Sequence, residues 1–254
     1  MSAVSITRKP TGNDTEWVIY RDISMSPYDI AWVAMIPVPL YKETKLSKDF
    51  KLAFPECFAW LLNSQNESGS WSRTGACSIA PDLSSLWSLG VFKDHAGTYF
   101  EERLREIGFT LEHFNNIFEK GTCFMRYALN EWDIDDDDAN MAGFEIVAPF
   151  LISQLEKLDS PIFLDFPNKK RLLKENKRKI SQIPIEAMSK LASIHQPLEA
   201  FIGVINLSCI QNSRFQAING SYGSSAITAA VLIDAPKWDD KAYEFLQKII
   251  SRCF

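Results

Sequence analysis

The chain has 254 residues, of which 46% are apolar and 23% charged, a composition typical of a globular protein with a buried core. Its net charge of −5 argues against a dedicated nucleic-acid binder, because such proteins usually carry a basic excess. No stretch approaches the roughly 20 apolar residues that span a bilayer, and the polar N-terminus lacks the features of a signal peptide. We therefore expect a cytoplasmic protein without a membrane span.

Cysteine and histidine give little support for a metal or redox site. The five cysteines lie far apart without a C-x-x-C pair, and the three histidines form no H-E-x-x-H motif. Scattered cysteines in a chain without a secretion signal are typical of reduced thiols that pack rather than react. We expect no cofactor for this chain alone.

The first half of the chain predicts helices after a loose lead-in over residues 1–25. An apolar run over 28–36 indicates a short buried helix. Residues 54–64 indicate a second helix, because their apolar residues recur at i, i+4, i+7 and i+8 on one face. Over 72–97 small residues, a proline and a glycine interrupt any helical period, and we assign no element there.

Helical patterning resumes over 99–129, where we expect Gly121 to divide the stretch, and continues over 144–158. Near the C-terminus, Ser224 and Asp239 are each followed by an apolar-patterned run, which predicts two capped helices. No credible series of strands is present. The sequence therefore predicts an all-α fold built from successive helix pairs.

Residues 168–179 hold seven Lys or Arg residues. Such a run could contact phosphates. The alternative is a solvated helix face, with Leu172 and Leu173 packing inward. The acidic balance of the whole chain favours this second interpretation.

A turn with the pattern Q-x-x-x-G-x-W is formed by Gln65, Gly69 and Trp71. We expect the glutamine amide to tie the end of one helix to the next, the glycine to adopt a left-handed turn, and the tryptophan to pack over the joint. A degenerate second copy follows at 216–222, with tyrosine in place of tryptophan. This spacing indicates a structural role in a helix-pair barrel, not catalysis.

An acidic run over 133–138 contains the pattern D-x-D-D at Asp133, Asp135 and Asp136. Residues 136–140 also read D-D-x-x-N, like a magnesium motif. These are candidate catalytic acids. However, protonation of an alkene needs a carboxylic acid that is kept neutral by an apolar pocket and a paired carboxylate. Five aspartates on a polar segment are expected to be hydrated and ionised, so we interpret the run as a decoy.

Several segments together resemble class II diterpene cyclases of the copalyl-diphosphate-synthase type, in particular the fungal bifunctional terpene synthases. The opening segment is similar to their S-A-Y-D-T-A-W-V-A motif through Tyr28, Asp29 and Trp32, although Ile30 replaces the usual threonine. The Q-x-x-x-G-x-W turn resembles their QW motif. The matching segments follow the family's order and are SPYDIAWVAMIP (26–37), FPECFAWLLNSQNESGSW (54–71), MAGFEIVAP (141–149), PLEAFIG (197–203) and residues 220–232.

The resemblance implies an α/α-barrel of the kind called a γ domain, part of a βγ didomain. It assigns 41–254 to that barrel, which ends as though truncated, and makes the helix in 26–40 a candidate for packing on an adjoining β domain. In the family a variable acidic segment precedes G-F-E-I-V-F-P, as residues 133–138 precede Gly143. The true D-x-D-D of such an enzyme would then fall after residue 254.

For full-length relatives the resemblance implies magnesium-assisted, proton-initiated cyclisation of geranylgeranyl diphosphate to a copalyl-type diphosphate. The acid-bearing domain is absent from this chain, so we expect no activity from it alone. It would then need a separate β or α domain or a partner chain. Two alternatives stay open: a shortened cyclase that uses Asp133, Asp135 and Asp136, and a non-catalytic binding or scaffolding fragment that acts with a separately encoded partner.

Overall fold

The computed structural model describes residues 26–38, 50–72, 79–133, 143–182, 198–202, 211, 216–217 and 219–254. Within these ranges every regular element is a helix, and Pro37 and Leu52 form an isolated antiparallel bridge. The all-α prediction is confirmed. The helices are α1 (Pro27–Ala34), α2 (Pro55–Ser64), α3 (Ile79–Ala96), η3 (Gly97–Tyr99), α4 (Phe100–Glu106), α5 (Leu111–Glu131), α6 (Phe144–Leu155), α7 (Lys169–Gln182), η4 (Leu198–Phe201), α10 (Ser225–Asp234) and α11 (Asp240–Cys253).

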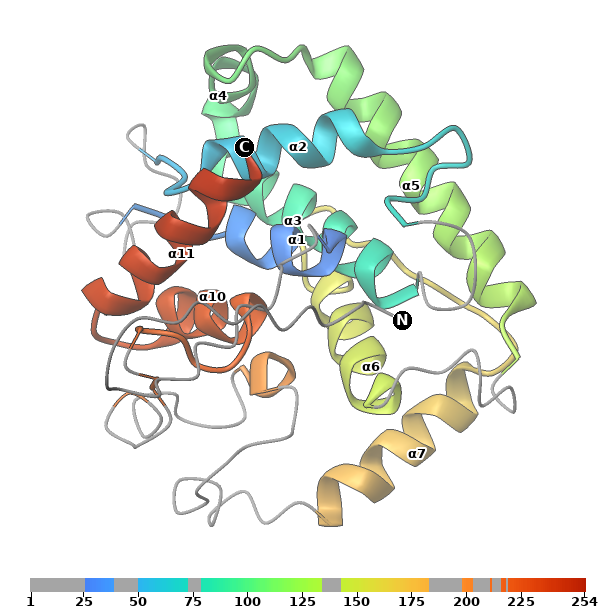
Figure 1. Cartoon of the computed structure of the whole chain (residues 1–254). Coiled ribbons are helices and arrows are strands. Elements are labelled where there is room, and N and C mark those ends of the chain that lie inside the picture. Colours follow the sequence, from blue (N-terminus) through green and yellow to red (C-terminus); the bar gives the residue numbers. More distant parts are fainter. Residues whose placement is uncertain are drawn as a thin grey trace, which may run out of the picture.

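Helix α3 lies at the centre of the assembly, in contact with α1, α4, α5 and α6. Figure 1 shows it behind α1, with the other helices arranged around this pair. The sequence predicted no element for the residues that form α3. The reason is that α3 is buried on nearly every side, so apolar and small residues occupy all of its faces and no polar face marks a helical period.

Helix α1 is as deeply buried as α3. It contacts α2, α3 and α10, and the indole of Trp32 is fully buried, 5.0 Å from the ring of Trp87 and 6.2 Å from that of Phe150. Aromatic rings at these separations stabilise a core beyond the burial of their area. The packing of this helix on a further domain stays a prediction, as does the division of the chain into 1–25, 26–40 and 41–254.

Helix α5 runs without a break through Gly121, which differs from the expected division at this residue. Glycine is needed there because a β-carbon would lie 2.7 Å from the indole of Trp71. The side chain of Thr110 caps the helix by accepting a hydrogen bond from the backbone N–H of His113 over 3.1 Å. The glycine therefore marks a close contact between the helix and the turn after α2.

Helix α7 is attached to the body through α6 and lies at the periphery (Figure 1). Leu172 is buried against the body, whereas Leu173 is 38% exposed, so only the first of the two leucines packs inward as expected. At the other end of the chain, Ser224 and Asp239 cap α10 and α11. Each accepts a hydrogen bond of 3.1 Å from a backbone N–H of the first turn, as predicted.

Candidate functional site

The candidate catalytic aspartates are only partly described by the structure. Asp133 is exposed just after the end of α5, whereas Asp135, Asp136 and the rest of the run to Asn140 lie outside the described residues. Among the described residues, no three His, Cys, Asp or Glu side chains gather closely enough to hold a metal ion.

The first glutamine turn joins α2 to α5. The side-chain amide of Gln65 donates to the carbonyl of Gly69 over 3.0 Å and to that of Ile117, in α5, over 2.8 Å. Gly69 has a φ of +96°, and a β-carbon there would lie 2.5 Å from the carbonyl oxygen of Lys120. The indole of Trp71 closes the joint by donating to the carbonyl of Leu61 over 2.7 Å. The turn serves as a connector between two helices.

The second glutamine turn repeats this arrangement between α10 and α11. The amide of Gln216 donates to Oδ2 of Asp239 over 2.6 Å, and the hydroxyl of Tyr222 donates to the same oxygen over 2.7 Å. Burial raises the pKa of Tyr222, and the hydrogen bond to Asp239 and the charge of that carboxylate raise it further. Gly220 has a φ of +93°, and a β-carbon there would lie 2.1 Å from the carbonyl oxygen of Lys241. In both turns a glycine in the left-handed region lets the backbone approach a neighbouring helix.

A buried carboxylate lies beneath the first glutamine turn. It was not identified as a candidate from the sequence. Asp82 is fully buried in the first turn of α3 and accepts hydrogen bonds of 2.7 Å from the hydroxyl of Ser70 and from the backbone N–H of Trp71. The positive end of the helix dipole favours a carboxylate at this position. No signal pointed to Asp82, because α3 itself was not predicted.

A second cluster of buried titratable groups lies where α1 meets η4. The hydroxyl of Tyr28 donates to Oε1 of Glu199 over 2.8 Å, and Glu199 is only 5% exposed. The pKa of Glu199 is raised to about 7, mainly by burial and with a smaller contribution from the nearby Asp29, against the opposing effect of a backbone hydrogen bond and the Tyr28 hydrogen bond. The pKa of Tyr28 also lies well above its ordinary value, mainly because of burial. Sequence reasoning identified Tyr28 but gave Glu199 no role.

Asp29 links α1 to α10. Its Oδ1 accepts a hydrogen bond of 3.1 Å from the backbone N–H of Ala226, in the first turn of α10, where helix N–H groups lack a partner within the helix. Burial raises the pKa of Asp29. Tyr28, Asp29 and Trp32 are thus brought together at the core, each contacting a different neighbour: η4, α10 and the aromatic rings of α3 and α6.

Glu199 meets the electrostatic requirement for a proton donor, since it is a carboxyl group buried beside a second carboxyl group. Access for a substrate is the condition that Glu199 does not meet. The described residues line a pocket near Asp29, between α1, α10 and α11, whose cavity volume is only about 10 Å³. Ligand pockets usually measure about 300–1,000 Å³. Glu199 and its neighbours are therefore better suited to holding helices together than to binding a substrate.

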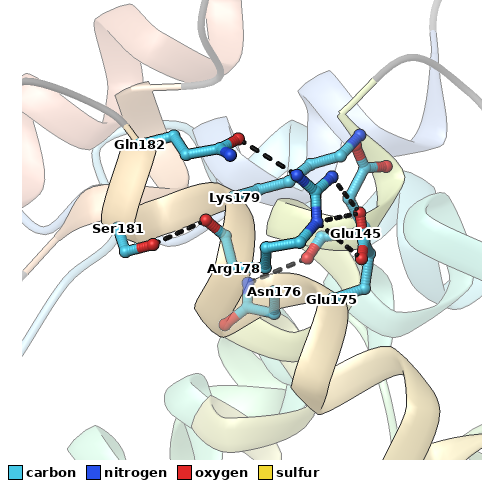
Figure 2. Close-up of polar contacts among 7 residues, drawn as sticks. All are labelled: Glu145, Glu175, Asn176, Arg178, Lys179, Ser181 and Gln182. Carbon is cyan, nitrogen blue, oxygen red and sulfur yellow. Dashed lines mark hydrogen bonds and ion pairs between the residues drawn. The ribbon is translucent and has the colours of Figure 1, made fainter.

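Polar contacts also hold α7 to the start of α6 (Figure 2). Lys179 forms an ion pair with Glu145, and the amide of Asn176 donates to the backbone carbonyl of Glu145 over 2.8 Å. Along the helix itself, Arg178 binds Glu175 through its guanidinium group. At the other end of α7, the amide of Asn168 donates to the carbonyl of Trp132 over 3.0 Å. Part of the basic run thus has acidic partners.

Comparison with known proteins identifies relatives that are much longer than this chain. The ent-kaur-16-ene synthase of Fusarium fujikuroi is 32% identical over 229 residues, which cover 89% of this chain and 23% of that protein. The copalyl diphosphate synthase of Talaromyces verruculosus is 31% identical over 89% of this chain and 22% of its own length. The chain therefore spans less than a quarter of the length of these relatives. No family model matches it.

Solved structures share the fold. Abietadiene synthase from Abies grandis has a TM-score of 0.67 at 24% identity, and the match covers 90% of this chain and 27% of that one. The ent-copalyl diphosphate synthase from Arabidopsis thaliana also has a TM-score of 0.67, at 22% identity over 90% of this chain and 29% of its own. These matches confirm the predicted α/α-barrel class. Together with the sequence relatives, they show that this chain is similar to one region of longer diterpene synthases.

Proposed function

We propose that this chain acts in terpenoid biosynthesis as one helical domain of a class II diterpene cyclase and that it needs further protein to cyclise a substrate. The proposal rests on one combined observation: the share of each chain that the sequence match covers, together with the shared fold. Nearly nine-tenths of the chain matches fungal diterpene synthases, yet the match accounts for only 23% of the first of them.

The geometry of the described residues supports a structural domain. The two glutamine turns, the Asp82 carboxylate and the Tyr28–Glu199 pair each join helices to one another. The buried Glu199 has the electrostatics of an acid catalyst, but the nearby pocket is small for a diphosphate with a twenty-carbon chain. The reacting acid and most of the cavity would then come from the missing protein.

The proposed substrate of the assembled enzyme is geranylgeranyl diphosphate or a related prenyl diphosphate, and the proposed compartment is the cytoplasm. Relatives named as copalyl diphosphate synthases support this substrate class. Magnesium would assist the assembled enzyme as it is expected to assist full-length relatives. No described helix is long and apolar enough to cross a membrane.

Complementation tests the proposal. The copalyl diphosphate synthase of Talaromyces verruculosus would be expressed without the region that matches this chain, and the chain would be added separately with geranylgeranyl diphosphate and magnesium. Cyclic diphosphate products, dephosphorylated and identified by mass spectrometry, are expected only when both proteins are present. A stable complex of the two proteins without any product would instead favour the scaffolding alternative.

A further inference from the structure

The outer face of α7 carries three lysines without an acidic partner among the described residues. Lys170, Lys174 and Lys177 follow one another at i, i+4 and i+7, which places them on one side of the helix. All three are exposed, and none of them forms an ion pair with another described residue. Leu173, 38% exposed, lies next to them on the same side. We call these four residues the α7 outer face.

The other side of α7 is neutralised and packed. Lys169 binds Glu156 over 2.9 Å, and Lys179 binds Glu145 (Figure 2). Leu172, 1% exposed, anchors the helix to the body, which α7 contacts through α6. The two sides of α7 therefore have different roles. The inner side holds the helix in place, and the outer face presents positive charge with one apolar side chain.

The charge of α7 contrasts with that of the rest of the protein. The helix has seven basic residues and one acidic residue, a net charge of +6, while the whole chain carries −5, so the remainder carries −11. A polyanion that wraps around the molecule would meet repulsion from this remainder. A flat anionic surface can instead touch the peripheral helix alone.

We infer that the α7 outer face docks this protein on an anionic lipid surface. Lysines near such a surface are attracted by its negative potential, and a leucine among them can enter the interfacial region. Phe163, 67% exposed in the segment that leads into α7, is a second exposed apolar side chain, of a type that interfacial helices bury at the headgroup boundary. An acidic protein partner would use the lysines but would give no role to these apolar side chains.

Docking would matter for catalysis if the proposed function holds, and this role rests on that proposal. A prenyl diphosphate combines a long apolar chain with a charged head, so it partitions into lipid interfaces. A cyclase domain held at the same interface would meet its substrate there. The docking itself depends only on α7 and can be measured without any substrate.

Vesicle flotation tests the inference with the intact chain. Vesicles of phosphatidylcholine would be compared with vesicles that also contain phosphatidylserine, and binding is expected only to the second kind and only at low salt. Each lysine contributes roughly fivefold, so K170Q/K174Q/K177Q should weaken binding on the order of a hundredfold. A Leu173→Ser variant should weaken binding by a smaller factor.

The matched control neutralises three exposed lysines elsewhere, as K120Q/K237Q/K241Q, and should bind phosphatidylserine vesicles as the unaltered chain does. Circular dichroism would confirm that both triple variants are folded. Equal weakening in the two triple variants, or no preference for phosphatidylserine, would overturn the inference. So would binding to polyglutamate without binding to vesicles, which would point to an acidic protein partner. The complementation assay is unaffected by these outcomes, so failure of docking and failure of the proposed function can be told apart.

Discussion

The hydroxyl of Tyr28 donates a hydrogen bond of 2.8 Å to Oε1 of Glu199, and so joins α1 to a turn 171 residues further along the chain. Tyr28 is half-buried against the core and Glu199 is buried, and burial keeps Glu199 protonated at pH values where an exposed glutamate is ionised. Asp29, the next residue after Tyr28, holds the start of α10. Two consecutive residues thus fasten two distant parts of the chain to the central helices.

Stability should depend on pH through Glu199. Its pKa is 4.5 ordinarily and about 7 in the folded protein, so between these values the folded chain binds more protons than the unfolded chain. This stabilising contribution is complete below pH 4.5 and is lost as the pH rises through 7, by about 3 kcal/mol in all. Glu199→Gln should flatten this slope in urea unfolding, while Glu119→Gln, on the exposed face of α5, should leave it unchanged. An unchanged slope in Glu199→Gln would contradict this assignment.

Gly69 should tolerate no side chain. Gly69→Ala must place a β-carbon 2.5 Å from the carbonyl oxygen of Lys120 at a φ of +96°, and we expect it to lower the free energy of unfolding by about 2–4 kcal/mol. Gly108 is the matched control, since its φ is +87° and nothing lies within 4 Å of the added atom. Gly108→Ala should cost about 1–2 kcal/mol, the left-handed strain alone. Equal costs in chemical denaturation would show that the approach to α5 is unimportant.

Asp82 should be required for the turn that ends at Trp71. Asp82→Ala leaves the backbone N–H of Trp71 and the hydroxyl of Ser70 without this acceptor in a buried place, and we expect a loss of about 2–4 kcal/mol in the free energy of unfolding. Asp94→Ala removes a half-buried carboxylate that accepts from the backbone N–H of Asp159, and it should cost less, about 1 kcal/mol. Similar losses in both variants would rule out a special role for the buried carboxylate.

The acidic run should be dispensable for turnover. Replacing Asp133, Asp135 and Asp136 together by Asn should leave product formation in the complementation assay within about twofold of the unaltered chain, because the proposed function places the reacting acid in the added protein. Loss of turnover with the fold retained would restore these residues as the catalytic acids.

Local sequence patterns predicted the capped helices and the short buried α1, but not the longer central α3. The caps at Ser224 and Asp239 could be predicted because a capping side chain and the helix that it begins are adjacent in sequence. The central α3 could not, because a helix buried on all sides shows no amphipathic period. The sequence also wrongly suggested a helix break at Gly121, because the reason for a glycine there lies outside the local sequence. The partner that requires it, Trp71, lies 50 residues away.

Only one residue of each buried polar pair could be predicted from the sequence. Tyr28 and Asp29 belong to a recognisable segment, but Glu199 and Ala226 reach them only through the tertiary fold. Nothing near Glu199 in the sequence marks it as buried, and its raised pKa follows from packing between α1 and η4. Long-range contacts of this kind need the structure.

The most direct test of the central claim is incubation of the purified, folded chain with geranylgeranyl diphosphate and magnesium, followed by dephosphorylation and mass spectrometry. We predict unchanged substrate with the chain alone, and a bicyclic product once the remainder of a relative is added. A bicyclic alcohol from the chain alone would contradict the account and would show that these 254 residues contain a complete cyclase site.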